Sequence, residues 1–243
     1  MIHPRVLIVK LLKVARLNKI LAKIYYKYFH GFNSAGKELP GVIEKCFDKA
    51  IELETIEEGD YYEFGIYKGY TFAHACNYAK KMKFDKMRFF GFDSFEGLPE
   101  IEGLDITRDM PFYKGQYCAG KEQVRKDIDG TGVDWSKAHL IEGFFNKSLN
   151  DETRDKFDMK KISVALVDCD LYSSTVEVLD FIKNMIFDRT ILIFDDWNTF
   201  NKNNDRGQRK AFGDFLDANK HISAESFFSY GAWGKVFIVR IDR

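Results

Sequence analysis

Acidic residues lie at or near the ends of five strand-like runs in this sequence, an arrangement that can do chemistry. The runs cover residues 60–66, 87–93, 138–142, 162–168 and 190–195, and their acids are Glu63, Asp93, Glu142, Asp168 and Asp195. The carboxyl ends of parallel strands meet at one edge of a sheet, where open α/β folds bind their ligands. We therefore expect these side chains to form one site.

Asp168, Asp195 and Asp196 are the residues best suited to bind a metal ion. They follow two strands that we expect to be adjacent, and three converging carboxylates repel one another unless a cation lies between them. Ligation by oxygen alone, without Cys or His, favours Mg²⁺. The alternative is a carboxylate cluster held by Lys or Arg. Asp170 is close to this cluster and is available for proton transfer.

The segment 63–71 predicts a tight turn between a strand and a helix. Gly65 and Gly69 allow the backbone to turn sharply and approach a ligand, and a helix that begins near Tyr70 offers free N–H groups. The spacing is Gly-x-x-x-Gly, whereas a dinucleotide site has Gly-x-Gly-x-x-Gly. A structural glycine turn is the alternative. Glu63 favours a functional role, because an unpaired carboxylate at a buried strand end is costly.

Asp93 ends the next strand-like run, and an acidic residue there typically accepts hydrogen bonds from a ribose diol. The alternative is a helix N-cap or an Asx turn in the loop that follows.

Strands and helices alternate along the chain, which predicts a mainly parallel sheet covered on both faces. We expect helices over 70–83, 121–128, 175–186 and 208–219. A hairpin of 225–230 and 235–241 closes the chain around a Gly-Ala-Trp-Gly turn. The fold class is α/β, with one domain over 42–243 and an N-terminal arm over 1–41.

Composition excludes several classes of protein. The 243 residues hold 37 Lys+Arg and 37 Asp+Glu, and 45% are hydrophobic, which argues against disorder and against nucleic-acid binding through net positive charge. No apolar run approaches the roughly 18 residues of a membrane span. The four cysteines form no Cys-x-x-Cys pair, so neither a zinc site nor a disulfide framework is expected, and a reducing cytoplasm is the simplest location.

The arm carries seven basic residues and no acidic one between Met1 and His30. Its apolar residues recur at helical spacing, which predicts a basic amphipathic helix, and a loop over 31–41 follows. Such a helix can pack on the acidic body, cover an active site or pair with a second subunit. Contact with an acidic membrane surface is the less favoured alternative.

Six motifs occur in order and together resemble the macrocin O-methyltransferase family, a branch of the class I S-adenosylmethionine-dependent methyltransferases that act on sugar hydroxyls. The motifs are Glu-Phe-Gly-Ile-Tyr-Lys-Gly-Tyr-Thr (63–71), Gly-Phe-Asp-Ser-Phe-Glu-Gly-Leu-Pro (91–99), Glu-Gly-Phe-Phe (142–145), Asp-Cys-Asp-Leu-Tyr-Ser-Ser-Thr (168–175), Phe-Asp-Asp-Trp (194–197) and Gly-Gln-Arg-Lys-Ala-Phe-Gly-Asp-Phe (207–215). The match spans about residues 60–215. The first motif and the aspartate spacing also resemble the more distant catechol O-methyltransferase.

The resemblance implies a Rossmann-like fold with a seven-stranded sheet, and it assigns roles to residues. Its glycine turn would hold the methionine part of S-adenosylmethionine, and Asp93 with Ser94 would hold the ribose. The full set implied for the cofactor is Glu63, Phe64, Gly65, Tyr67, Gly69, Thr71, Asp93, Ser94, Gly143, Phe144 and Asp168. Asp168, Asp195 and Asp196 would bind Mg²⁺, and either Asp168 or Asp170 would be the general base.

The resemblance also implies a small sugar acceptor, which is a nucleotide-linked sugar, a surface polysaccharide or a glycosylated natural product. We expect no nucleic-acid partner. We expect a homodimer that forms through the arm. The segment 145–149 departs from the family pattern, whereas the arm and an insert over 101–120 match it poorly and would shape the acceptor site.

Two other functions compete with methyl transfer. A metal-dependent glycosyltransferase would use Asp168-x-Asp170, but it leaves the 63–71 turn and the Asp195–Asp196 pair without a role. A non-catalytic membrane-surface protein would act through the arm, and the retained acidic residues argue against it.

Overall fold

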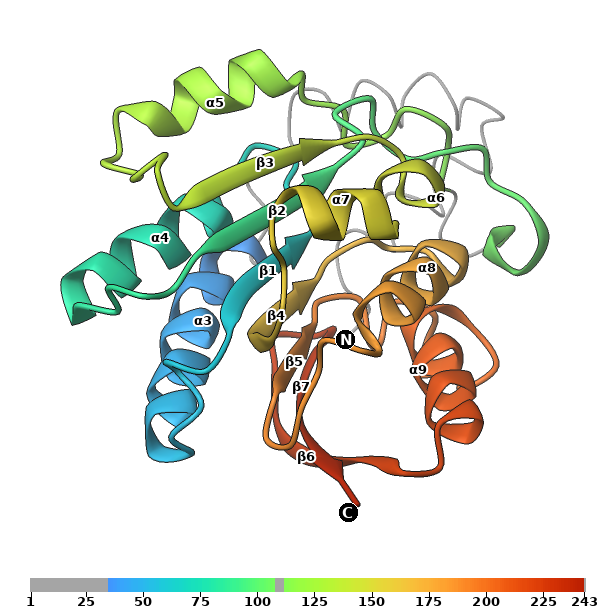
Figure 1. Cartoon of the computed structure of the whole chain (residues 1–243). Helices are drawn as coiled ribbons and strands as arrows, with labels where there is room; N and C mark the ends of the chain where they lie inside the picture. Colours follow the sequence, from blue (N-terminus) through green and yellow to red (C-terminus); the bar gives the residue numbers. More distant parts are fainter. Residues whose placement is uncertain (1–34, 108–111, 243) are drawn as a thin grey trace.

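Seven strands form one mixed sheet in the order β3-β2-β1-β4-β5-β7-β6 in the computed structural model, which describes residues 35–107 and 112–242 (Figure 1). The first five strands pair in parallel, and β7 is antiparallel to both β5 and β6. The strands are β1 Asp60–Phe64, β2 Phe89–Asp93, β3 Ala138–Glu142, β4 Ile162–Val167, β5 Ile191–Phe194, β6 Ile222–Tyr230 and β7 Gly234–Ile241. The α/β class and the C-terminal hairpin predicted from the sequence are confirmed.

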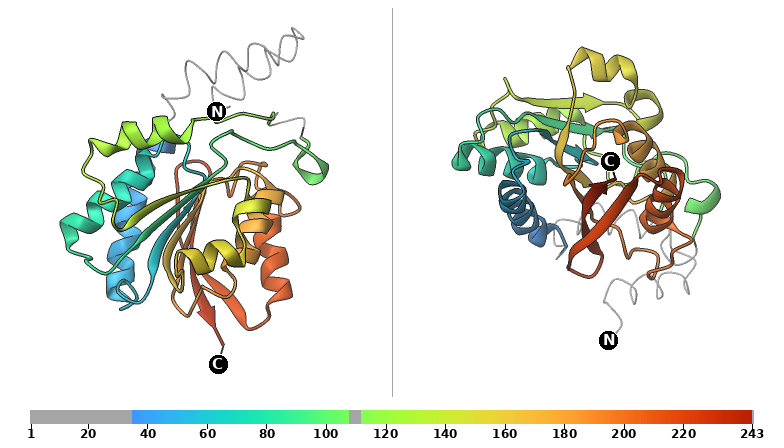
Figure 2. Two further views of the ribbon diagram at one scale, coloured as in Figure 1. Left: turned by 45° about the horizontal axis from the view of Figure 1, so that its top comes forward. Right: turned by 60° about the horizontal axis from the view of Figure 1, so that its bottom comes forward.

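Helices cover both faces of this sheet (Figure 2). The helices are α3 Ala35–Glu52, α4 Tyr70–Met82, α5 Lys121–Asp129, α6 Phe145–Ser148, α7 Asp151–Lys156, α8 Tyr172–Ile182 and α9 Gly207–Ala218, with a short 3₁₀ turn, η2, at Gly103–Asp105. On one face α3, α4 and α5 contribute buried residues such as Phe47, Phe72 and Ile128 to a first core. On the other, Val178 of α8 and Phe212 of α9 belong to a second. The sheet therefore separates two hydrophobic layers.

The central strands are buried on both sides, as their continuous apolar sequences predict. Every residue of β1, β4 and β5 is buried. The strand order reverses at β1, which pairs with β2 on one side and β4 on the other. In doubly wound sheets a crevice opens at this switch point, outside the carboxyl ends of the strands.

Gly65 lies at this switch point, and its backbone conformation and surroundings require glycine. Its φ is +96°, and a Cβ atom would lie 1.8 Å from the backbone oxygen of Asp168. The glycine therefore allows the backbone of this turn to lie close to the end of the neighbouring strand, and not only close to a ligand.

The predicted loop over 31–41 is wrong for its described part, because α3 begins at Ala35 and contains Pro40. Pro40 lies in the second turn of a helix that buries Ile43, Cys46 and Phe47, so this packing outweighs the breaker signal. The amphipathic helix and dimer contact predicted for the arm fall mainly on residues 1–34, outside the described residues. The described part contains no helix that is both long and apolar enough to cross a membrane.

Candidate functional site

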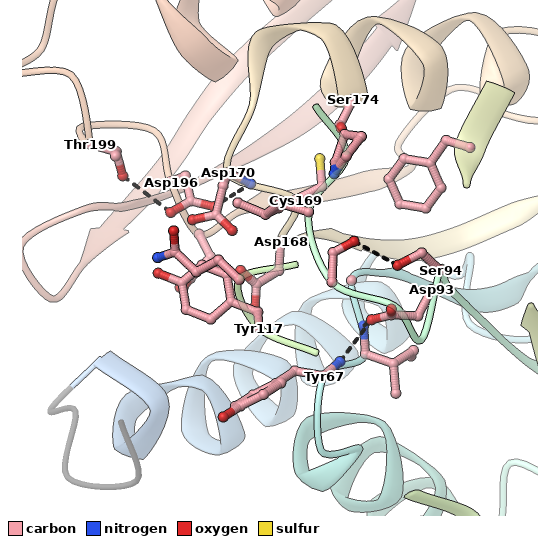
Figure 3. A pocket seen from close by; sticks show the side chains of 18 of the residues that line it. Tyr67, Asp93, Ser94, Tyr117, Asp168, Cys169, Asp170, Ser174, Asp196 and Thr199 are labelled. Atoms are coloured by element: carbon pink, nitrogen blue, oxygen red, sulfur yellow. Dashed lines mark hydrogen bonds between the residues drawn. The ribbon is translucent and has the colours of Figure 1, made fainter. Parts of the chain in front are cut away.

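A cavity of about 880 Å³ lies over the carboxyl ends of the parallel strands. Its walls come from the turn after β1, the loops after β2 to β5, the insert after β2, and the β6–β7 turn. Most residues nominated by the sequence line it: Gly65, Tyr67, Thr71, Asp93, Ser94, Phe144, Asp168, Asp170, Asp195 and Asp196. In Figure 3, Asp170 and Asp196 lie together on one side of Asp168, and Asp93 lies on the other side beside Tyr67.

Four nominated residues do not line the cavity, and each has a role inside the protein. Phe64 is fully buried and stacks on Phe92 with ring centroids 5.1 Å apart. Gly69 is the left-handed N-cap of α4, where a Cβ atom would lie 2.9 Å from Val124. Gly143 has φ +139°. Glu63 is the fourth of these residues, and the assignment of all four to the cofactor stays a prediction.

Glu63 is fully buried and stabilises the first turn of α4. Its carboxylate accepts hydrogen bonds from the Tyr61 hydroxyl at 2.7 Å, from the Thr71 hydroxyl at 2.6 Å and from the Phe72 amide. Burial raises the pKa of Glu63 to about 7, although these hydrogen bonds act in the opposite direction. A carboxylate at a helix N-terminus also satisfies N–H groups that the helix leaves unpaired. Thr71 lines the cavity, so Glu63 holds a residue of the cavity wall in place.

Asp93 holds the turn after β1 in place. One of its oxygens accepts hydrogen bonds from the Ile66 and Tyr67 amides at 2.7 and 2.9 Å, and the other accepts from Phe95 at 2.7 Å. Burial raises the pKa of Asp93 despite these hydrogen bonds. The Asx turn that the sequence left as an alternative is therefore present, and Asp93 still lines the cavity.

Asp168, Asp195 and Asp196 converge as predicted. One carboxylate oxygen from each lies within 4.8 Å of the others. Burial, followed by the charges of Asp195 and Asp196, raises the pKa of Asp168 well above its usual range. Ligands on opposite sides of an octahedral Mg²⁺ are about 4.2 Å apart, so the three oxygens need little movement to bind one ion. The donor set and the spacing fit a hard cation.

Several residues fix this aspartate cluster. The Tyr230 hydroxyl donates to Asp195 Oδ1 at 3.0 Å, and the Thr199 hydroxyl donates to Asp196 Oδ1 at 3.1 Å. Gln208, fully buried on α9, accepts from the Asp196 amide at 3.0 Å and donates to the Val167 carbonyl at 2.9 Å. Gln208 thus joins the ends of β4 and β5. This support orients the ligands, as outer residues commonly do in metal sites.

Asp170 lines the cavity beside the cluster in a left-handed conformation, with φ +59°. Its amide donates to Asp196 Oδ2 at 3.0 Å. Non-glycine residues rarely adopt this conformation, and such positions gather at functional sites. The conformation holds the backbone of Asp170 against a member of the cluster.

Sequence reasoning missed the residues that distant segments bring to the cavity. Tyr117 and Gln116 come from the insert, and Trp233 comes from the turn between β6 and β7. The insert is anchored by Asp105, whose two carboxylate oxygens accept from the Tyr172 and Ser173 amides at the start of α8. The sequence signal for Trp233 was its place in the Gly-Ala-Trp-Gly turn. No local motif marked Gln116 or Tyr117.

Known proteins resemble this chain in both sequence and fold. Residues 31–225 match the model of the family described as Macrocin-O-methyltransferase (TylF). The 8-demethyl-8-(2,3-dimethoxy-alpha-L-rhamnosyl)-tetracenomycin-C 4'-O-methyltransferase of Streptomyces olivaceus is 26% identical over 144 residues, which cover 57% of this chain and 53% of that protein. The chain therefore spans about half the length of this curated relative.

Solved methyltransferase structures share the fold. The O-methyltransferase NovP has a TM-score of 0.67 at 16% identity, with 84% of this chain and 79% of that chain covered. The calicheamicin methyltransferase CalS11 has a TM-score of 0.62 at 19% identity, with 80% and 77% covered. At these identities the likeness establishes the class I methyltransferase architecture.

Proposed function

The chain belongs to the macrocin O-methyltransferase family, and we propose that it transfers the methyl group of S-adenosylmethionine to a hydroxyl group of a sugar. The observation that carries this proposal is the shared cavity, in which the turn after β1 and the aspartate cluster face one space. One half of that space suits the cofactor, because it lies over the ends of β1 to β3. The other half lies beside the cluster and suits the acceptor.

Asp168, Asp195 and Asp196 would hold Mg²⁺ in this enzyme. When bound, S-adenosylmethionine supplies an activated methyl group and Mg²⁺ lowers the pKa of an acceptor hydroxyl. The protein provides a fixed set of three oxygen ligands, held by Tyr230, Thr199 and Gln208. Preorganised ligands of this kind avoid the cost of ordering the site during the reaction.

Asp170 is the base that we favour. Asp168 belongs to the ligand cluster, whereas Asp170 lines the cavity next to it and is fixed by its amide contact with Asp196. In the proposed step the hydroxyl proton moves to the Asp170 carboxylate and the acceptor oxygen forms a bond to the methyl carbon. The carbon–sulfur bond breaks, and its electron pair stays on sulfur as S-adenosylhomocysteine leaves. Alignment of the two reactants in one cavity supplies much of the acceleration.

The charge of the cavity favours a neutral glycoside over a nucleotide-linked sugar as the acceptor. Among its described lining residues are nine carboxylates, three lysines and no arginine. A cationic cofactor and a divalent ion would offset only part of this excess, and a pyrophosphate group would still be repelled. The name of the Streptomyces olivaceus relative includes a rhamnosyl natural product. This name agrees with an acceptor sugar that is already attached to an aglycone.

A reducing compartment suits this enzyme, and we propose that it works in the cytoplasm. All four cysteines are free, and Cys46, Cys76 and Cys169 are buried. Burial raises the pKa of the Cys46 thiol, which keeps it in the unreactive protonated form.

Calorimetry with three ligands tests the proposal against its rivals. We expect S-adenosylmethionine to bind the full-length protein, and UDP-sugars and anionic vesicles to give no signal. Binding of a UDP-sugar without S-adenosylmethionine binding would support the glycosyltransferase alternative. Vesicle binding alone would support a membrane-surface protein, and either result would refute methyl transfer.

A further inference from the structure

Glu177 is a carboxylate of the cavity wall that the proposed methyl transfer does not use. It lies on α8 one turn after Ser173 and Ser174, which line the same cavity. The residue is only partly buried, so its carboxylate is within reach of a molecule in the cavity. Burial raises the pKa of Glu177, and no cation among the described residues forms an ion pair with it. A bound hydrogen-bond donor would stabilise this carboxylate.

One amide of the protein already faces the Glu177 carboxylate. The Asn146 N–H group donates a hydrogen bond to it, which favours the charged form. Asn146 belongs to α6, the short helix after β3, and α6 lies against α8 (Figure 1). The two oxygens of a carboxylate accept about four hydrogen bonds, so one amide leaves most of this capacity unused. The contact holds Glu177 beside the segment that follows β3.

The end of β3 is where the base of a bound cofactor would lie. β2 lies between β1 and β3 in the sheet. In sheets of this type the ribose of a bound nucleotide lies at the end of the second strand, where this chain has Asp93. In the proposed function the methionine part lies on one side of the ribose, at the turn after β1. The base therefore extends to the other side, towards the end of β3.

The cavity wall at this end suits a flat purine ring. It is lined from two directions, by the segment after β3 with Phe144, Phe145 and Asn146, and by the segment after β4 with Cys169, Ser174 and Glu177. Phe145 is held by an edge-on contact with buried Phe64, with ring centroids 6.2 Å apart. Apolar and aromatic surface with a small number of placed polar groups is typical of small-molecule sites. Glu177 is the one ionisable acceptor among these six residues.

We propose that the Glu177 carboxylate accepts a hydrogen bond from the exocyclic amino group of the adenine ring of bound S-adenosylmethionine. The inference rests on the proposed function. The amino group is a donor and an ionised carboxylate only accepts, so the two groups are complementary. A base with an oxygen in this position would bring its lone pairs against those of the carboxylate. Glu177 thus selects adenine over a 6-oxopurine, because specificity follows from repulsion of the wrong ligand as well as from attraction of the right one.

Two variants separate this contact from the fold. Glu177→Gln has nearly the same shape as the wild type. Because an N–H group cannot donate to a carboxamide –NH₂ group, the new oxygen stays with the Asn146 amide and the –NH₂ group faces the ligand. Glu177→Met removes both contacts. Glu152→Gln is the matched control, because Glu152 is exposed on α7 and does not line the cavity.

The test is calorimetry with S-adenosylhomocysteine and with its analogue in which purine replaces adenine, so that only the amino group is absent. We expect the wild type to bind the purine analogue about tenfold more weakly, the size of one lost hydrogen bond. Both Glu177 variants should bind S-adenosylhomocysteine about tenfold more weakly and should not distinguish it from the purine analogue. The hypoxanthine analogue should bind Glu177→Gln more tightly than the wild type, because the –NH₂ group donates to its oxygen. The control should bind all three ligands like the wild type.

Three outcomes would overturn the inference. The wild type could bind the purine analogue as tightly as S-adenosylhomocysteine, a result that does not depend on the folding of any variant. The Glu177 variants could keep the wild-type preference for adenine. A change confined to the KM of the acceptor would place Glu177 in the acceptor site instead. Failure of the wild type to bind S-adenosylhomocysteine would count against the proposed function itself, so the two failures are distinguishable.

Discussion

Acidic residues at this site divide into two groups by what they contact. Glu63 and Asp93 accept hydrogen bonds from hydroxyl and amide groups of the protein and hold the turn after β1. Asp168, Asp195 and Asp196 instead bring carboxylate oxygens within 4.8 Å of one another. In the proposed function, the first group shapes the part of the cavity assigned to the cofactor, and the second would provide the charge that a metal ion requires.

Asp195→Asn should reduce turnover about 10³-fold, because several kcal/mol of stabilisation depend on a complete ligand set. Binding of S-adenosylhomocysteine should change little, since Asp195 directly follows β5, away from the turn after β1. Steady-state kinetics and calorimetry measure the two effects. Asp217→Asn, at an exposed ion pair with Lys220, is the control. Unchanged turnover in Asp195→Asn would refute the metal assignment.

Tyr230→Phe should weaken Mg²⁺ binding 10- to 100-fold, as a rough expectation for loss of a residue that orients a metal ligand. Burial, and then the charge of Asp195, raise the pKa of Tyr230 well above its ordinary value, so its hydroxyl stays protonated and donates. The Mg²⁺ concentration for half-maximal activity is the measurement. A variant with wild-type Mg²⁺ dependence would show that the Tyr230 contact does not tune the site.

The insert and α8 are coupled elements. Asp105 of η2 is 3% exposed and accepts hydrogen bonds from the first amides of α8. It thus acts as an N-cap residue does, although it belongs to a segment far from α8 in the sequence. Arg206 adds hydrogen bonds from its side chain to the Leu104 and Ile106 carbonyls. The insert is therefore tied to the helix that begins just after Asp170.

Asp105→Ala should lower the free energy of unfolding by about 1 kcal/mol, the typical effect of a lost helix cap. Because the insert lines the cavity, the KM for the acceptor should also rise, while kcat changes less. Urea unfolding and steady-state kinetics provide the two measurements, and Asp127→Ala on the exposed surface of α5 serves for comparison. Equal stability and an unaltered KM would contradict the proposed anchoring.

Elements with strong local patterns were predictable from the sequence. The apolar runs of β4 and β5 are buried on both faces, and β3 spans the residues predicted for it. The start of α3 was not predictable, because the Gly36, Pro40 and Gly41 signals favour a loop and only tertiary packing of Ile43 and Phe47 opposes them.

The site was predictable where one motif contributes adjacent residues, as at Asp195 and Asp196. It was not predictable where the contact depends on chain segments far apart. Gln208 joins β4 to β5 from α9, and Tyr230 reaches Asp195 from β6. A sequence also cannot show that the hydroxyl groups of Tyr61 and Thr71 donate hydrogen bonds to the Glu63 carboxylate.

At the scale of the whole molecule, stability should depend on the protonation of Glu63. Its folded pKa of about 7 lies above the ordinary value of 4.5, so the folded protein binds this proton more tightly than the unfolded chain. The contribution of this proton to the free energy of unfolding is complete at pH values below the pKa that Glu63 has in the unfolded chain. It is lost as pH rises from about 4.5 through about 7.

Glu63→Gln should remove this pH dependence. Between about pH 5 and pH 8 the wild type should lose about 2.5 kcal/mol relative to Glu63→Gln, from roughly 1.4 kcal/mol for each unit of raised pKa, because part of the loss already occurs below pH 5. Urea unfolding of both proteins across this range gives the difference. Parallel pH profiles for the two proteins would mean that Glu63 is ionised in the folded state.

The charge of the molecule is zero overall, but it is unevenly distributed. Acidic side chains concentrate at the cavity, where nine described carboxylates face three lysines. In the proposed function, that arrangement would attract a cationic cofactor and a divalent ion and would repel phosphorylated acceptors. The net charge therefore says little about function until the location of the charges is known.

The most direct test of the central claim is to incubate the protein with S-adenosylmethionine, Mg²⁺ and a panel of neutral glycosides, with nucleotide-linked sugars beside them. Mass spectrometry would follow both products. The account predicts equal amounts of S-adenosylhomocysteine and an O-methylated glycoside, abolished by chelation of Mg²⁺ and by Asp195→Asn. Methylation of nucleotide-linked sugars alone would contradict the acceptor class, and no methylated sugar from any acceptor in the presence of Mg²⁺ would contradict the claim itself.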